Sequence, residues 1–253
     1  MTKIYLFICF LYNRFFTYFE NLFLFNPSKQ KEITNLSKKG FEIIKIKDNL
    51  VLKNPEKVFK SNTFMSKDII KNDDIFEFID LLFNKINLKN IITNKTGYEY
   101  SVDFIISYTT FNIPDLEQYR EIYANHWHTD KPFSKNTLKI IIPLNESLNY
   151  NGGIKIFDLL QTKNIKKKIS FFDKEKYFNM ESKINNILFF LPNICFHKAG
   201  IAQSVEGRKQ IMLQLNPSTR WSVNKNLYEK QFKLEPKFPF FSYLFDKKNY
   251  YKY

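Results

Sequence analysis

The chain is poor in cysteine and histidine, and it has no long apolar run. Its 253 residues include two cysteines, Cys9 and Cys195, so a framework of several disulfides is excluded and the usage fits a reducing, cytoplasmic compartment. The longest apolar run, residues 4–12, is shorter than the roughly 20 residues that a membrane-spanning helix needs. No small-residue cleavage site follows it, so we expect no signal peptide.

Acidic residues are also scarce relative to basic ones. The chain has 39 Lys+Arg against 25 Asp+Glu, a formal net charge of +14. A basic surface favours anionic partners, such as a phosphorylated or carrier-linked small-molecule substrate or an acidic membrane face. A/T-rich codons account for part of the excess, because Lys, Asn, Ile, Phe and Tyr are all abundant. The longest basic run, residues 166–168, is too short to indicate a nucleic-acid site, and we do not expect nucleic acid as a partner.

The three histidines fall in two places, at His126 and His128 and far downstream at His197. Residues i and i+2 of a strand point to the same face, so His128 and Asp130 can reach one metal from one short segment. His197 must then arrive from a distant strand. Two imidazoles and one carboxylate with open positions beside them form the metal-binding triad of non-haem Fe(II) oxygenases. We therefore predict a metal on His128, Asp130 and His197.

Residues next to this triad leave alternatives open. His126 could replace His128 as a ligand or hydrogen-bond to it, but only His128 makes the His-x-Asp spacing. Trp127 should point to the opposite face and pack there. Cys195 stands two residues before His197 and either lines the same pocket or packs as a small buried hydrophobe.

An arginine is placed to hold a co-substrate. Three protein ligands leave three positions on iron, which a bidentate 2-oxo acid and O2 can fill. The far carboxylate of such an acid needs a cation, and a guanidinium binds it with two hydrogen bonds. Arg208 follows His197 by eleven positions (208 − 197 = 11) and opens the next predicted strand, so we assign it this role.

Five segments carry a resemblance to a known family: HWHTDKPFSKNTLKIIIPLNE, NGGIKIFD, NNILFFLP, FHKAG and EGRKQIMLQLNPS. Together they resemble the phytanoyl-CoA dioxygenase-like family of Fe(II)/2-oxoglutarate-dependent oxygenases, over roughly residues 98–217. The resemblance implies a mainly β fold, a double-stranded β-helix (jelly roll) with flanking N-terminal helices. It also implies iron on His128, Asp130 and His197, 2-oxoglutarate on Arg208, and a hydroxylase that uses O2 and releases succinate and CO2. Lys139 matches a lysine of some relatives and is expected to touch the co-substrate.

The chain departs from this family in one region. The family often follows its glycine turn with a Pro-Gly-Ser-His run, where residues 157–160 here read FDLL. That region often shapes the substrate entrance, so the substrate does not carry over. The Gly-Gly turn and the Gly-Arg pair also resemble prolyl-4-hydroxylase-like oxygenases, but those usually hold 2-oxoglutarate with a lysine, and Arg208 favours the first family. Asp130 argues against a halogenase, which needs that position vacant for halide.

Hydrophobic periodicity divides the chain into four parts: an N-terminal amphipathic helix at 1–27, a helical or mixed support region at 28–97, the jelly-roll core at 98–217 and a C-terminal extension at 218–253. In the first part a polar stripe is surrounded by aromatic residues, which fits a helix that lies in a membrane interface or packs on the barrel. The polar stripe consists of Asn13, Arg14, Thr17, Glu20 and Asn21.

The remaining pattern predicts individual elements. A helix is expected at 72–86, capped by Asn72 or Asp73, and strands at 41–46, 100–108, 138–144, 154–157, 187–191 and 209–215. Residues 161–185 are Lys-rich and poorly periodic, and we interpret them as a loop with an edge strand at 169–172.

Two other functions remain open. The aromatic residues of the tail, among them Phe238 and Tyr243, stand between lysines and could stack bases or bind a membrane, or dock on the core or on a second copy. The alternatives to an oxygenase are a non-catalytic metal-binding jelly roll and a basic peripheral membrane or nucleic-acid binder that uses both aromatic ends.

Overall fold

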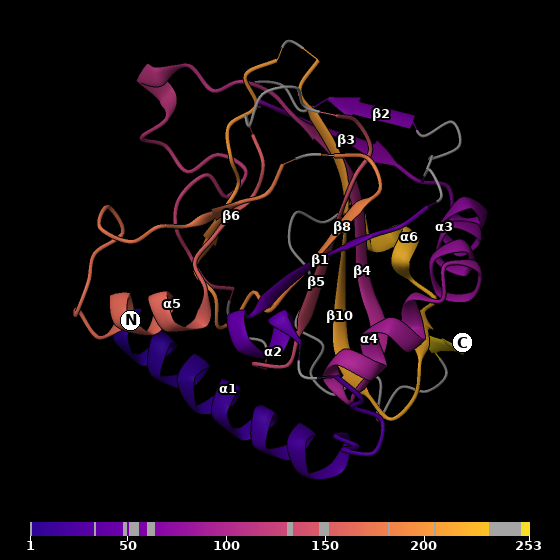
Figure 1. Cartoon of the computed structure of the whole chain (residues 1–253). Coiled ribbons are helices and arrows are strands. Elements are labelled where there is room, and N and C mark those ends of the chain that lie inside the picture. Colours follow the sequence, from indigo (N-terminus) through magenta and orange to yellow (C-terminus); the bar gives the residue numbers. More distant parts are fainter. Residues whose placement is uncertain are drawn as a thin grey trace.

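A large sheet and a small sheet form the body of the protein. The computed structural model describes residues 2–32, 34–47, 50, 56–59, 64–130, 134–146, 152–181, 183–204, 206–232 and 249–253. The large sheet has nine strands there and the small sheet three. Figure 1 shows the small sheet, marked by β6, to one side of the long strands of the large sheet. The predicted mainly β, jelly-roll architecture is confirmed.

The large sheet is mostly antiparallel. Its order is β1 (Phe41–Lys45), β8 (Asn186–Phe190), β5 (Leu138–Pro143), β10 (Arg208–Ser218), β4 (Glu99–Thr110), β11 (Ser222–Asn224) and β12 (Tyr250–Lys252). The β11–β4 pair is parallel, and β3 (Met65–Ile69) pairs with both β4 and β2 (Glu56–Phe59). The small sheet has the order β7 (Phe178–Asn179), β6 (Lys155–Ile156) and β9 (His197–Lys198).

Alternation along the central strands separates two cores. In β10, Ile211 and Leu213 belong to the larger apolar cluster, whereas Met212 between them packs against the smaller one. Successive side chains of a strand point to opposite faces, so Ile211 and Leu213 mark the outer face of the large sheet and Met212 marks its interior face. The smaller cluster also contains Ile156 of the small sheet, which places it between the two sheets.

Helices cover the outer face. The larger cluster includes Ile75 and Ile79 of α3 (Asn72–Asp80), Leu82 of the π-helical segment Leu81–Lys85, and Ile92 of α4 (Leu88–Thr96). These positions recur at helical spacing, and burying such a face is what fixes a surface helix. The predicted helix at 72–86 is therefore present. Its N-cap residue is Lys71, not the predicted Asn72 or Asp73, and the Lys71 side chain makes no capping hydrogen bond.

The predicted loop at 161–185 was wrong in its first part, which is α5 (Leu159–Lys166). The Asp158 carboxylate accepts a hydrogen bond from the Gln161 backbone, and the Gln161 side chain accepts one from the Asp158 backbone. This capping box satisfies two backbone donors that a helix start otherwise leaves unpaired. No strand occurs at 169–172, where the structure shows turns and bends; the edge strand of the small sheet is β7.

The two ends of the chain lie on the outside. The long helix α1 (Thr2–Phe23) runs along the edge of the molecule below α2 (Asn35–Lys39) in Figure 1. At the other end, the short helix α6 (Leu227–Lys230) precedes β12, where Tyr250 is buried and donates a hydrogen bond to Asp103. The aromatic stretch around Phe238 and Tyr243 lies outside the described residues. Within the described part of the chain, no helix combines the length and apolarity needed to cross a membrane.

Candidate metal centre

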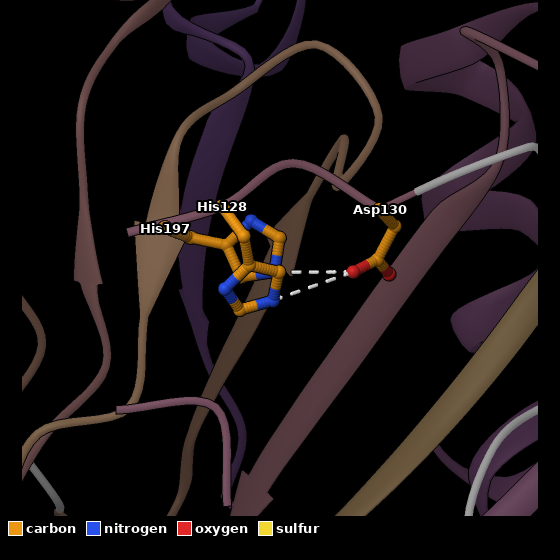
Figure 2. Close-up of side chains that lie close together, drawn as sticks. All are labelled: His128, Asp130 and His197. Atoms are coloured by element: carbon orange, nitrogen blue, oxygen red, sulfur yellow. Dashed lines mark ion pairs between the residues drawn. The ribbon is translucent and has the colours of Figure 1, made fainter. Parts of the chain in front are cut away.

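The two histidines of the predicted triad are held face to face by their own backbones. His128 N donates to the His197 carbonyl at 3.0 Å, and His197 N donates to the His128 carbonyl at 2.9 Å. This reciprocal pair is an isolated antiparallel bridge, so both side chains leave on the same face, and the ring centroids are 4.3 Å apart. Figure 2 shows the two rings converging on Asp130.

Neighbouring carbonyls fix which ring nitrogen is free. His128 Nδ1 lies 2.8 Å from the carbonyl of His126, and His197 Nδ1 lies 3.1 Å from the carbonyl of Cys195. Because a carbonyl only accepts, each Nδ1 must carry the proton, which leaves Nε2 with a free lone pair. Both Nε2 atoms point to Asp130 Oδ1, at 3.6 Å and 3.5 Å.

The predicted triad therefore comes together in space. The ligand atoms of His128, Asp130 and His197 all lie within 4.8 Å of one another. Ligands held at about 2 Å from a metal are separated by roughly 3 Å, so small side-chain movements would close the three atoms around one ion. Asp130 is aligned by its own backbone, since its N–H donates to the Pro192 carbonyl at 3.0 Å.

The charges around Asp130 and His197 favour metal ligation. Burial opposes ionisation of Asp130, but the Lys139 ammonium and both histidines hold the pKa of this carboxyl well below its usual range. Burial lowers the pKa of the His197 imidazole, so His197 stays neutral at neutral pH. A deprotonated carboxylate and a neutral imidazole are the forms that bind a metal.

Lys139 lies against Asp130 through its Nζ atom, in an ion pair with Oδ2. The Oδ1 atom of the same carboxylate faces the two histidines, so one oxygen is neutralised by lysine and the other is directed to the centre. This contact was not predicted. The expected contact of Lys139 with a co-substrate stays a prediction.

Arg208 is a buried cation with unused donors. Its residue is 1% exposed, and its Nε and Nη1 atoms find no hydrogen-bond partner in the described structure. Burial lowers the pKa of the guanidinium, and the side chains of Tyr108 and Tyr123 act in the opposite direction. Arg208 lies four residues before Met212 in β10 and therefore shares its face of the strand. Because Met212 marks the interior face, the Arg208 side chain lies on the side of the small sheet. Buried donors without partners are rare in proteins and indicate a missing ligand or water.

Sequence reasoning missed a second polar group on this face. Gln214 is completely buried, and neither its amide nitrogen nor its amide oxygen has a hydrogen-bond partner among the described residues. It stands opposite Lys139 in the β10–β5 register. The sequence did contain a signal for this group. Every second residue from 208 to 214 shares one face of β10, and three of these four residues are polar: Arg208, Gln210 and Gln214, with Met212 as the exception.

The other side chains singled out in the sequence lie nearby but outside the triad. Trp127 packs against Phe157 on the opposite face, as predicted, with ring centroids 4.3 Å apart. His126 instead contacts the Gln118 carbonyl through Nε2, at 3.1 Å. Cys195 is a fully buried member of the smaller apolar cluster, and its carbonyl orients His197.

A polar cavity of about 600 Å³ lies at the small sheet, and none of the three triad residues lines it. Lys155 and Lys198 line it and are direct partners in the β6–β9 register. Burial and the charge of Lys155 both lower the pKa of Lys198. No carboxylate of the described chain lies within ion-pair distance of either lysine, and Asp115 is the acidic residue that lines the cavity. Lys198 follows His197 directly, so its side chain leaves β9 on the opposite face, where Nζ lies over the Trp127 ring at 5.0 Å from its centroid.

Comparisons with known proteins bear on the fold. No protein-family model and no curated protein matches the chain. Among solved structures, the non-heme alpha ketoglutarate dependent epimerase SnoN from nogalamycin biosynthesis matches with a TM-score of 0.51 and 10% identity, over 73% of this chain and 81% of that one. EctD from S. alaskensis, solved with 2-oxoglutarate and 5-hydroxyectoine, matches with a TM-score of 0.50 and 12% identity, over 77% and 82%. At this identity the similarity establishes the shared fold alone.

Proposed function

We propose that the protein is an Fe(II)/2-oxoglutarate-dependent dioxygenase. One observation carries the proposal: a His-Asp-His cluster and a buried arginine with unsatisfied donors lie in the same interior. The cluster is the donor set that Fe(II) accepts, and the arginine supplies what the far carboxylate of a 2-oxo acid needs. The fold supports it, because the two similar structures named above are described with alpha ketoglutarate or 2-oxoglutarate.

The residues present fit both groups. His128, Asp130 and His197 would hold the iron, since their free Nε2 and Oδ1 atoms converge. Arg208 would hold the distal carboxylate of 2-oxoglutarate, because its Nε and Nη1 donors are buried and without partners. When bound, iron and 2-oxoglutarate together supply activation of O2, with conversion of the co-substrate to succinate and CO2.

Other groups of the chain orient the two histidines and stabilise the charge of Asp130. In the neutral rings, the carbonyls of His126 and Cys195 hold the proton on Nδ1, so Nε2 is the nitrogen that would bind the metal. Lys139 keeps the Asp130 carboxylate charged despite its burial. The apolar side chains of the smaller cluster, such as Phe190, whose ring lies 5.0 Å from that of His197, shield His197 from water, which strengthens its interaction with Asp130.

The reaction is a hydroxylation, and the substrate is a small or carrier-linked molecule with an anionic group. The resemblance to the phytanoyl-CoA dioxygenase-like family supports hydroxylation, and the formal net charge of +14 supports an anionic group on the substrate. Gln214 is placed to hydrogen-bond a polar ligand inside the barrel through both amide atoms.

Formation of succinate from 2-oxoglutarate tests the proposal. The purified protein, supplied with Fe(II), 2-oxoglutarate and O2, should release succinate slowly without substrate, and His128→Ala should abolish this release. His126→Ala is the matched control, because it removes an imidazole two positions away that contacts Gln118 and not Asp130. If the wild type binds iron but forms no succinate with or without candidate substrates, a non-catalytic metal-binding jelly roll becomes the better account.

A further inference from the structure

The N-terminal helix α1 is amphipathic in the reverse sense. An ordinary surface helix buries its apolar face and exposes its polar face. In α1 the exposed side carries Leu11, Phe15, Tyr18 and Leu22, with Phe15 62% and Tyr18 69% exposed. Steps of four, three and four residues keep these four side chains within an arc of about 60°. They form one continuous strip, which we call the apolar stripe.

The polar side of α1 faces the protein. Glu20 is buried and accepts a hydrogen bond from Asn136 Nδ2 at 3.1 Å. Thr17 Oγ1 accepts one from the Lys135 backbone at 3.0 Å, and Asn21 accepts one from Asn136 at 2.9 Å. Each of these bonds fixes the rotation of the helix about its axis. Thr17, Glu20 and Asn21 of the polar stripe expected from the sequence therefore attach α1, and the apolar stripe is left on the outside.

We propose that the apolar stripe of α1 docks the protein on the surface of an anionic lipid membrane. Phe, Tyr and Leu on one side of a helix are the residues that enter the boundary between headgroups and acyl chains. The acidic residue of α1, Glu20, is turned inward, and the exposed Arg14 stands next to Phe15. With a net charge of +14, the protein as a whole is attracted to negative headgroups. Stable binding to a membrane surface needs two contributions, and here insertion of apolar side chains is combined with electrostatic attraction to the headgroups.

The attachment of α1 links this surface to the metal centre. Lys135 and Asn136, which hold the helix, belong to the segment that follows Asp130 along the chain. The same two residues come just before β5, whose Lys139 pairs with Asp130, so docking through α1 orients the metal centre relative to the lipid surface. Binding itself rests on the exposed side chains and does not depend on the proposed oxygenase activity.

Vesicle sedimentation of the full chain tests the proposal. Sucrose-loaded vesicles of phosphatidylcholine, with and without phosphatidylserine, are mixed with wild type and with the triple variant Phe15→Ser/Tyr18→Ser/Leu22→Ser. We expect wild type to bind the phosphatidylserine vesicles at least tenfold more tightly than the plain ones, and the triple variant to lose at least tenfold in that affinity. Because all three side chains are exposed, the variant should keep its circular dichroism spectrum and its melting temperature.

A matched control removes the same kind of surface elsewhere. Leu116→Ser/Tyr119→Ser/Leu160→Ser replaces three exposed apolar side chains that lie outside α1, and it should bind vesicles as the wild type does. Equal binding by the α1 variant and the wild type would overturn the proposal, as would absence of wild-type binding. A concentration-dependent dimer in lipid-free sedimentation that only the α1 variant abolishes would also overturn it, because a second copy would then cover the stripe.

Discussion

Replacing Arg208 with methionine should separate the stability of the protein from its affinity for 2-oxoglutarate. Methionine keeps a long, flexible side chain but removes the charge and all donors. Arg208 is buried, two of its donors have no partner, and no carboxylate of the described chain pairs with it. A buried unpaired charge is costly, and exchanging such groups for apolar ones is often neutral or stabilising by about 1–4 kcal/mol. The free energy of unfolding should therefore stay the same or rise.

Ligand affinity should move in the opposite direction. Hydrogen bonds to a charged group contribute about 1.5–3 kcal/mol each, so loss of the two unsatisfied donors, Nε and Nη1, costs about 4 kcal/mol of binding free energy. At 1.4 kcal/mol for each factor of ten, the dissociation constant of 2-oxoglutarate should rise roughly a thousandfold. Urea unfolding of the metal-free protein gives the stability, and anaerobic calorimetry of the Fe(II)-loaded protein gives the affinity.

Arg120→Met is the matched control for Arg208→Met. Arg120 is exposed and pairs with the neighbouring Glu117 at 2.7 Å, so its loss should change neither quantity measurably. The reasoning is refuted if Arg208→Met loses several kcal/mol of stability while 2-oxoglutarate binds as before. Arg208 would then support the fold and not a ligand.

Three further predictions concern the metal, a turn and pH. Calorimetry should show that His128→Ala loses Fe(II) affinity at least a hundredfold while His126→Ala retains it; equal losses would contradict the assigned ligand set. Gly153→Ala places a Cβ 1.5 Å from the Met180 carbonyl oxygen, so thermal unfolding should reveal a loss of about 3 kcal/mol or more, and an unchanged melting temperature would refute this contact. Burial raises the pKa of Glu20 from 4.5 to about 7, so the folded state keeps a proton that the unfolded state has lost between these values. The free energy of unfolding of the wild type should therefore fall by about 3 kcal/mol as pH rises through that window, and Glu20→Gln should remove this fall. Parallel pH profiles of stability for the two proteins would contradict the role of Glu20.

The parts of the site that the sequence predicts are those set by local spacing. His128 and Asp130 share a face because they are two residues apart in extended backbone, and the strands around them follow from runs of apolar residues. Local spacing does not predict which side chain contacts each residue of the triad. The contact of Lys139 with Asp130 depends on how β5 lies beside the segment that carries His128 and Asp130, and no local pattern contains that distance.

The orientation of α1 shows the same limit. Periodicity finds a polar and an apolar side, but it cannot say which side faces the protein. Here the decision is made by hydrogen bonds from Lys135 and Asn136, more than a hundred residues away in the sequence (|i−j| = 118 for Lys135 to Thr17). The helix α5 was missed for a different reason, since the lysines around it hid the short capping box at Asp158 and Gln161.

The most direct test of the central claim is an anaerobic absorption titration of the metal-free protein with Fe(II) and then with 2-oxoglutarate. The account predicts the visible charge-transfer band that is typical of a 2-oxo acid bound to Fe(II) in wild type, its absence in His128→Ala, and a weaker band at equal ligand in Arg208→Met. If wild type binds Fe(II) but no band appears at saturating 2-oxoglutarate, the His-Asp-His centre does not carry this co-substrate and the proposed oxygenase function is contradicted.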